Sequence, residues 1–170
     1  KKDYPLNINT QGNGSVNKKV ITSTTNYEHG TTVELTAKAD TGWRFDHWEG
    51  EVTGSENPKT ITVDSEKSVT AVFVKKEYPL NINIEGNGSV DEKIVTTTAD
   101  YKHGTTIELT AVADTGSKFD HWEGAITGSE NPKKITVDGE KTVTAVFVKY
   151  KVGMVVQTDA AGNWVAKDGL

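Results

Sequence analysis

The segment "TTVELTAKAD" occupies Thr31–Asp40, and its apolar side chains alternate strictly with polar ones. Val33, Leu35, Ala37 and Ala39 fall on one side of an extended chain, and the polar residues between them fall on the other. A period of two indicates a strand with one face in a core, and no stretch of the chain shows a convincing helical period. The sequence therefore predicts an all-β fold.

Similar segments lie farther along the chain. "KTITV" (Lys59–Val63) and "SVTAVFV" (Ser68–Val74) show the same alternation, in residue types that favour strands. Turn-forming residues separate the segments at Asp40–Gly42, at Gly54–Pro58 ("GSENP") and at Asp64–Lys67. We expect about six short strands in this part of the chain.

The whole pattern then occurs a second time. "YPLNINTQGNGSV" from Tyr4 matches "YPLNINIEGNGSV" from Tyr78, and the alignment continues without a gap at mostly identical positions. We divide the chain into copy 1 (residues 4–76), copy 2 (residues 77–150) and a C-terminal segment (residues 151–170). The linker "VKKE" (Val74–Glu77) is short and leaves little slack, so we expect a semi-rigid tandem pair.

The glycines at Gly12 and Gly14 predict a hairpin between the first two strands. A three-residue loop from Gly12 to Gly14 would pair Leu6 with Val20 and keep the apolar side chains on one face. A two-residue Asn-Gly turn would mix the two faces. In the three-residue loop, Gly14 would occupy the left-handed third position.

The hexapeptide "FDHWEG" occurs at Phe45–Gly50 and again at Phe119–Gly124. In a regular strand Phe45 and Trp48 face opposite sides, so they share a core only if a bulge lies near Asp46–His47 or if the strand is covered on both faces. We expect core packing, and the alternative is Trp48 as a ligand platform. The predicted core aromatic residues are Phe45, Trp48, Phe73, Phe119, Trp122 and Phe147.

The polar residues of the hexapeptide could be interpreted as a metal cluster or an acid–base pair. Adjacent side chains on a strand diverge, so Asp46 and His47 would not reach one ion together without a distortion. The chain has no nucleophile elbow or zinc-protease helix, and no helix follows "GNG" to receive a phosphate. We expect no enzyme activity, no metal site and no cofactor.

The composition of the chain limits the kinds of ligand and partner that it could bind. The chain has 170 residues, a net charge of −5 and no cysteine, which excludes disulfides and thiolate metal sites. Lys and Arg are not concentrated in one segment, so we expect no nucleic-acid binding. No apolar run approaches the roughly 18–20 residues that cross a bilayer, so we expect no membrane insertion. The chain opens without Met, and we expect a piece of a longer protein.

Three aromatic residues are candidates for ligand contacts. Trp43 has no counterpart in copy 2, where Ser117 stands, and an exposed Trp43 could stack on a sugar ring. Tyr27 and Trp164 are the other two candidates. Trp164 lies in the C-terminal segment, where Met154–Gln157 and Asn163–Ala166 could form a hairpin or the start of a truncated neighbouring domain.

The two copies resemble the divergent InlB B-repeat family, also called Listeria–Bacteroides-type repeats. "YPLNIN", "GNGSV", "HGTTVELTA", "TGSENP" and the closing "VTAVF" carry the resemblance, together with Phe45, Trp48 and Gly50 of an F-x-x-W-x-G motif. The resemblance implies a small β-rich domain, with a β-grasp relative as one option, in large extracellular or surface proteins of bacteria. It implies no catalysis and no shared ligand site.

The expected function is that of a spacer or scaffold that orients neighbouring domains of the parent chain. The alternative is an adhesion module that binds polysaccharide or a host or surface protein through exposed aromatic side chains. The solvent exposure of the aromatic side chains distinguishes the two functions, because a binding module needs aromatic rings in one solvent-exposed plane and a spacer needs them buried.

Overall fold

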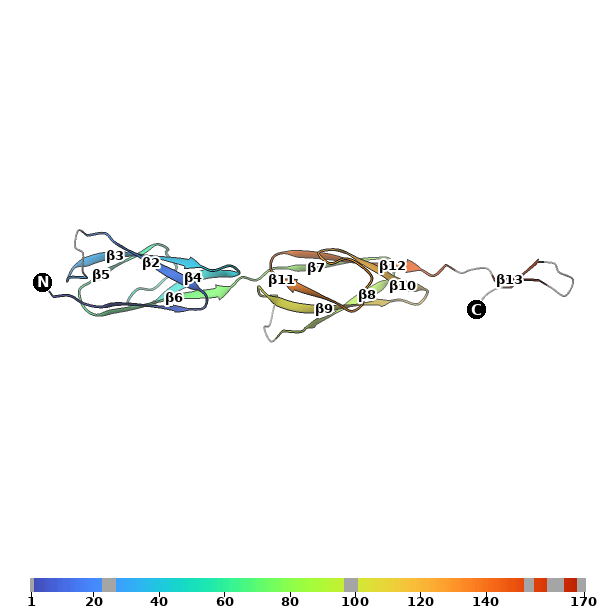
Figure 1. Cartoon of the computed structure of the whole chain (residues 1–170), viewed down its shortest axis with the longest axis horizontal. Helices are drawn as coiled ribbons and strands as arrows, with labels where there is room; N and C mark the ends of the chain where they lie inside the picture. The colour runs from blue at the N-terminus through green and yellow to red at the C-terminus, as the bar shows by residue number, and fades with distance from the viewer. Residues whose placement is uncertain (1, 23–26, 97–100, 152–154, 159–163, 168–170) are drawn as a thin grey trace. The chain divides into compact units, whose positions relative to one another are not determined.

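The computed structural model describes residues 2–22, 27–96, 101–151, 155–158 and 164–167, the last two ranges by backbone alone. Each copy holds six strands, as the sequence predicts, and the described residues contain no helix (Figure 1). The strands of copy 1 are β1 (Leu6–Gln11), β2 (Gly14–Val20), β3 (Thr31–Ala39), β4 (Trp43–Gly50), β5 (Lys59–Val63) and β6 (Lys67–Lys75). Those of copy 2 are β7 (Leu80–Glu85), β8 (Gly88–Ile94), β9 (Thr105–Ala113), β10 (Ser117–Gly124), β11 (Lys133–Val137) and β12 (Lys141–Lys149).

Each copy is built from two separate three-stranded sheets. In copy 1 the orders are β1-β6-β4 and β2-β3-β5, and in copy 2 they are β7-β12-β10 and β8-β9-β11. The all-β class is thereby confirmed. A β-grasp, a single mixed sheet covered by a helix, is not what the described residues form.

The predicted hairpin between the first two strands is wrong. β1 pairs in parallel with β6, from Leu6 opposite Lys67 to Gln11 opposite Val72, whereas β2 pairs antiparallel with β3. The chain therefore passes from one sheet to the other at Gly12–Gly14. Val20, which the hairpin placed opposite Leu6, lies opposite Val33.

The two glycines of "GNG" serve this crossing. Gly12 rather than Gly14 takes the left-handed conformation, with φ of 81°, and a Cβ there would lie 2.3 Å from the carbonyl oxygen of Phe73. At Gly14 a Cβ would lie 2.5 Å from the Phe73 ring. The glycines are therefore explained by the close approach of a phenylalanine that is distant in the sequence.

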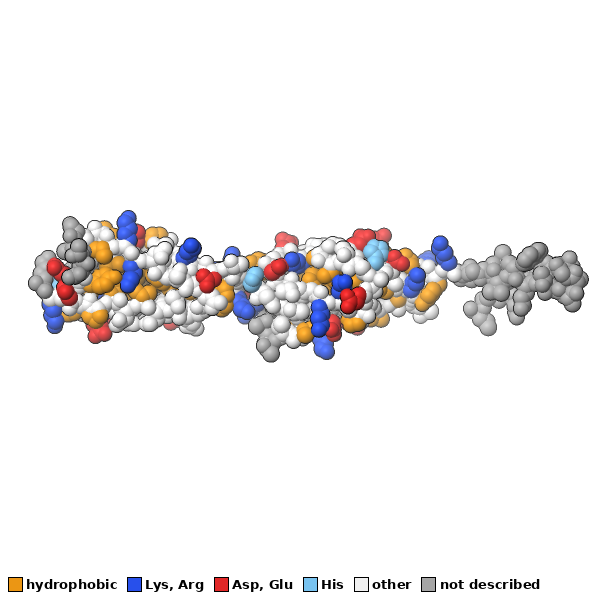
Figure 2. All heavy atoms as spheres, in the orientation of Figure 1, with side chains coloured by type: hydrophobic (Ala, Val, Ile, Leu, Met, Phe, Trp, Pro, Cys, Tyr) orange, Lys and Arg blue, Asp and Glu red, His pale blue; other side chains and the backbone are white. Residues whose placement is uncertain are grey.

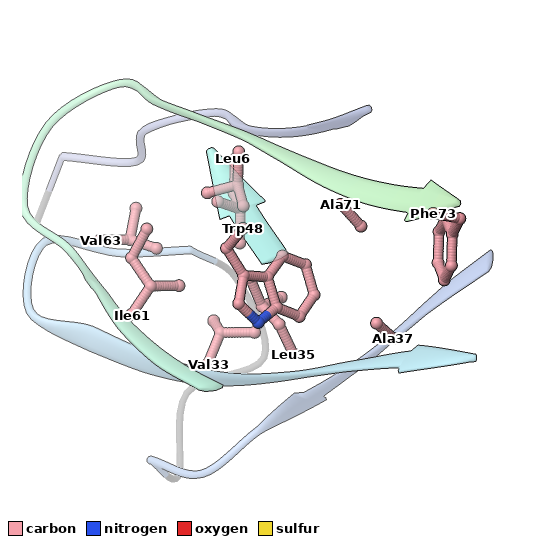
Figure 3. Packing of buried hydrophobic residues seen from close by; sticks show 10 residues of the cluster. Leu6, Val33, Leu35, Ala37, Trp48, Ile61, Val63, Ala71 and Phe73 are labelled. Atoms are coloured by element: carbon pink, nitrogen blue, oxygen red, sulfur yellow. The ribbon is translucent and has the colours of Figure 1, made fainter. Parts of the chain in front are cut away.

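The core of copy 1 lies between its two sheets. The alternation in β3 is confirmed, since Val33 and Leu35 are fully buried and Ala37 is nearly so. Figure 3 shows the Trp48 indole in the middle of the cluster, with Leu6 on one side and Val33 and Leu35 on the other. The buried cluster comprises Leu6, Val33, Leu35, Ala37, Trp48, Ile61, Val63, Val69, Ala71 and Phe73.

The C-terminal segment contains one strand pair. β13 (Val155–Thr158) runs antiparallel to β14 (Trp164–Lys167), with Val155 opposite Lys167 and Thr158 opposite Trp164. A strand pair is thus present where the sequence suggested a hairpin, displaced by one residue on each side.

Candidate functional site

The hexapeptide lies on β4 and contains a β-bulge. Phe45 is opposite Phe73 and His47 is opposite Val72, so Asp46 is the extra residue. The bulge lets Phe45 and Trp48 point into the same core, where their ring centroids are 5.0 Å apart. Of the two alternatives that the sequence left open, the bulge is confirmed, and it recurs in copy 2 between Phe119 and His121.

Four of the six predicted core aromatic residues are buried, and the other two are half-buried. Trp48 and Trp122 are completely buried, and Phe73 and Phe147 are buried. Phe45 is half-buried, and its ring lies 5.9 Å from that of Phe73. Phe119 is half-buried in the same way in copy 2, 5.8 Å from Phe147.

The bulge also gathers three polar side chains on the outer face. His47 Nδ1 lies 2.9 Å from Asp46 Oδ2, and His47 Nε2 lies 3.0 Å from Glu49 Oε1. The sequence analysis expected these side chains to diverge unless the strand was distorted, and the extra residue of the bulge is such a distortion. Arg44 is bonded to the other oxygen of Asp46, which completes a surface ion-pair network.

This network raises the pKa of His47 above its usual range, because the protonated ring donates hydrogen bonds to the carboxylates of Asp46, the larger cause, and of Glu49. The same bond to His47, followed by that from Arg44, lowers the pKa of Asp46. In copy 2 Glu123 and then Asp120 raise the pKa of His121. Since both ring nitrogens of His47 are bonded to carboxylates, neither is available as a ligand or a base unless a bond breaks. Among the described residues, no group of three or more acidic or histidine side chains is arranged to hold a metal ion.

We expect His47 and His121 to titrate above the ordinary value of 6.5 in the folded protein. A raised pKa means that protonation favours the folded state. The histidines therefore contribute stability fully below about pH 6.5, and this contribution is lost as the pH rises through the folded pKa. Imidazole NMR signals followed against pH measure both values.

The repeat supplies the control for this titration. Glu49→Gln should lower the pKa of His47 towards the ordinary value and leave His121 unchanged, and Glu123→Gln should do the reverse. A wild-type His47 that titrates at or below 6.5 would show that the network does not persist in solution.

A third function of the hexapeptide is to anchor the loop that carries "TGSENP". The Trp48 indole Nε1 donates to the Glu56 carbonyl oxygen at 2.8 Å, and the Trp48 backbone N–H donates to the Gly54 oxygen at 2.8 Å. The Asn57 side chain accepts from the Ala37 N–H and donates to the Ala37 oxygen, both at 2.8 Å. Asn57 therefore continues the pairing of β3 beyond Leu35, the last residue paired with β5. The sequence predicts only a turn at "GSENP", and the anchoring role of Asn57 is seen in the structure alone, although the segment recurs unchanged in copy 2.

The two candidate ligand-contact residues whose side chains the structure describes, Trp43 and Tyr27, do not lie together. Trp43 is half-buried opposite Lys75 at the end of β6, and the Lys75 ammonium lies 6.0 Å from its ring centroid. Tyr27 is half-buried at the other end of copy 1, where its carbonyl oxygen accepts from the Tyr4 N–H. The length of β6 separates the two by about 25 Å. The Trp164 side chain lies outside the described residues, although its backbone belongs to β14.

Surface charge shows no single-sign patch on the visible face. In Figure 2 acidic and basic side chains are interspersed over each copy, in keeping with the small net charge of −5. In the part of the chain that the structure describes, no helix is long and apolar enough to span a bilayer.

Comparison with known families agrees with this architecture. The model of the divergent InlB B-repeat domain matches residues 4–77 and 78–151, and that family is typical of surface or secreted bacterial proteins. Neither a search of curated proteins nor a search of solved structures found a match. Because the family model matches both copies and most of the sequence, the chain belongs to the divergent InlB B-repeat family as a tandem pair of its domains.

Proposed function

We propose that this chain is a non-catalytic tandem repeat of a bacterial surface or secreted protein, which spaces and orients the domains next to it. The observation that carries the proposal is the parallel pairing of the first and last strands of each copy. Parallel neighbours run in one direction, so the chain enters copy 1 beside the start of β6 and leaves at the end of β6. The entry and exit points of one copy are therefore roughly 25–30 Å apart.

The side chains that could suggest catalysis have structural contacts instead. Trp48 is buried and bonded to the Glu56 carbonyl, and both nitrogens of His47 are bonded to carboxylates. The His47 network is partly exposed to water, since the side chains of His47 and Asp46 are 38% and 32% exposed. These contacts support a scaffold rather than an enzyme.

A binding module is the alternative function, and Trp43 is the residue that favours it. Its ring is half-exposed, and copy 2 has a buried serine, Ser117, at the same position. A ring that one copy can lack is not required by the fold and could stack on a sugar. Against this alternative, Tyr27, the other candidate whose side chain the structure describes, lies at the opposite end of copy 1.

Affinity gels that contain a panel of polysaccharides test the alternative directly. We expect the wild type and Trp43→Ala to migrate alike on every gel. Specific retardation of the wild type that Trp43→Ala loses, with an unchanged circular dichroism spectrum, would replace the spacer proposal by a glycan-binding one.

A distance measurement tests the spacer itself. Spin labels on Lys2→Cys and Lys76→Cys should give a narrow distribution of distances across copy 1, centred at roughly 40 Å, because Lys2 lies four residues before Leu6 and Lys76 lies nine residues beyond its partner Lys67. The absence of native cysteine makes this labelling specific. A broad distribution would contradict a spacer of defined length.

A further inference from the structure

The strand pair that separates the two ends of each copy also determines how the copy responds to tension. We propose that each copy is a load-bearing module and that its parallel pair of first and last strands acts as a shear clamp. The clamp of copy 1 is Leu6–Gln11 against Lys67–Val72, and that of copy 2 is Leu80–Glu85 against Lys141–Val146. The inference rests on the proposed function, since tension reaches the clamp only through neighbouring domains.

The direction of the load follows from the register. Tension along the chain pulls β1 from the residues before Leu6 and pulls β6 from the residues after Lys75. Because Leu6 lies opposite Lys67, these two points are at opposite ends of the pair. The strands are therefore pulled past one another, and all the hydrogen bonds between them bear the load together. In a pair pulled from one end, the bonds would break one after another.

Side chains on the two faces reinforce the clamp of copy 1. On the inner face Leu6 is buried in β1, and Val69 and Ala71 are fully buried in β6. On the outer face the Asn7 amide donates to Glu66 at 3.4 Å, and the Asn9 amide donates to Ser68 Oγ at 3.5 Å. The inner face of the ladder is therefore apolar at Leu6, and its outer face is polar. Sliding β1 along β6 would also expose the buried apolar side chains.

The strand that receives the load is held on its other side as well. β6 is the central strand of its sheet and pairs antiparallel with β4 from Trp43 to Gly50. The Lys67 N–H extends the ladder by donating to the Pro5 oxygen at 3.0 Å. In copy 2, β12 is central in the same way between β7 and β10. β1 sliding on β6 is thus the first event that tension must drive.

Single-molecule pulling on the full chain tests the clamp by changing the direction of load. One handle is attached at Lys2→Cys and the other either at Lys76→Cys, beyond β6, or at Ser65→Cys, before it. All three positions are exposed. The first pair of handles loads the clamp in shear, whereas the second peels β1 from β6 starting at one end. We expect the rupture force of copy 1 to be several-fold higher with the Lys76 handle.

Two proline variants test whether the β1–β6 bonds carry the load. Since the Pro5 oxygen accepts from Lys67, the alternation of a parallel ladder directs the Asn9 N–H towards β6 and the Thr10 N–H away from it. Asn9→Pro should therefore lower the shear rupture force at least twofold. Thr10→Pro, on the same exposed edge strand, should change it little. Circular dichroism establishes that both variants are folded.

The outcomes separate this inference from the proposed function. Equal rupture forces for the two handle positions, or equal effects of the two prolines, would overturn the clamp. Either result would leave a spacer of fixed length intact, because length is measured by the spin labels. Conversely, a glycan ligand would overturn the spacer proposal. The difference in rupture force between the Lys76 and Ser65 handles could still be measured, and it would test the clamp by itself.

Discussion

Replacing Trp48 with alanine should lower the free energy of unfolding of copy 1 by about 3–5 kcal/mol. The indole is completely buried in the middle of the core, and its Nε1 holds the Glu56 carbonyl at 2.8 Å. The substitution removes both the packing and this bond, and it leaves a cavity between the two sheets. Since single domains are stable by only about 5–15 kcal/mol, the loss approaches the whole stability of copy 1. Urea denaturation followed by far-UV circular dichroism measures the change.

The chain contains matched controls for this experiment. Trp122→Ala makes the same change in copy 2, where the indole donates to the Glu130 oxygen at 2.9 Å, and should cost a similar amount. Trp43→Ala removes a half-buried tryptophan from the same strand as Trp48 and should cost much less. Trp48→Phe keeps most of the volume and isolates the loss of the indole bond. If Trp48→Ala and Trp43→Ala destabilised copy 1 equally, Trp48 would not be the centre of the core.

Asn57→Ala should destabilise copy 1 by about 2–3 kcal/mol, because it leaves the partly buried N–H and C=O of Ala37 without their partner. The Asn57 amide makes both bonds at 2.8 Å and substitutes for a residue of a neighbouring strand. Loss of the two bonds should also increase the mobility of the Gly54–Pro58 loop, which Trp48 contacts at Gly54 and Glu56. Hydrogen exchange of the Ala37 amide, together with urea denaturation, measures both effects.

Copy 2 again provides the comparison. Asn131 bonds the backbone of Ala111 at 2.9 and 2.8 Å, so Asn131→Ala should show an effect of the same size. Asn57→Asp retains an acceptor for the Ala37 N–H but places a carboxylate beside the Ala37 oxygen, and it should therefore not rescue stability. A change in Asn57→Ala no larger than the roughly 0.5 kcal/mol typical of surface sites would show that the amide is not structural.

The local features of the fold could be predicted from the sequence because local rules determine them. Alternation alone identified β3, β5 and β6, and turn residues separated them correctly. The bulge in β4 followed from a single requirement, that Phe45 and Trp48 share a core. What the bulge does to Asp46, His47 and Glu49 was missed, because the regular alternation was applied to them although the bulge interrupts it.

The pairing of the first two strands could not be predicted by the same means. The apolar residues of β1 and β2 share one face of an alternating pattern whether the two strands form a hairpin or lie in facing sheets, so the pattern fits both arrangements. In the structure Leu6 is buried, whereas Val20 at the end of β2 is exposed. Contacts from distant parts of the sequence decide between them. The Phe73 ring and carbonyl fill the space beside Gly14 and Gly12. The Asn57 amide was missed for a related reason, since its partner Ala37 is 20 residues away.

The position of β1 beside the final strand of its own copy has a consequence for how the protein folds. β1 must remain without its strand partner until β6 has been synthesised, and pairing between the ends of a domain makes for slow folding. β12 then presents an almost identical alternative, because "KTVTAVFVK" differs from "KSVTAVFVK" of β6 at one position. A β1 strand can exchange partners between copies with little loss of contact energy, a characteristic way in which repeat proteins misassemble. We expect the pairing to stay within a copy when each copy folds before its neighbour is complete.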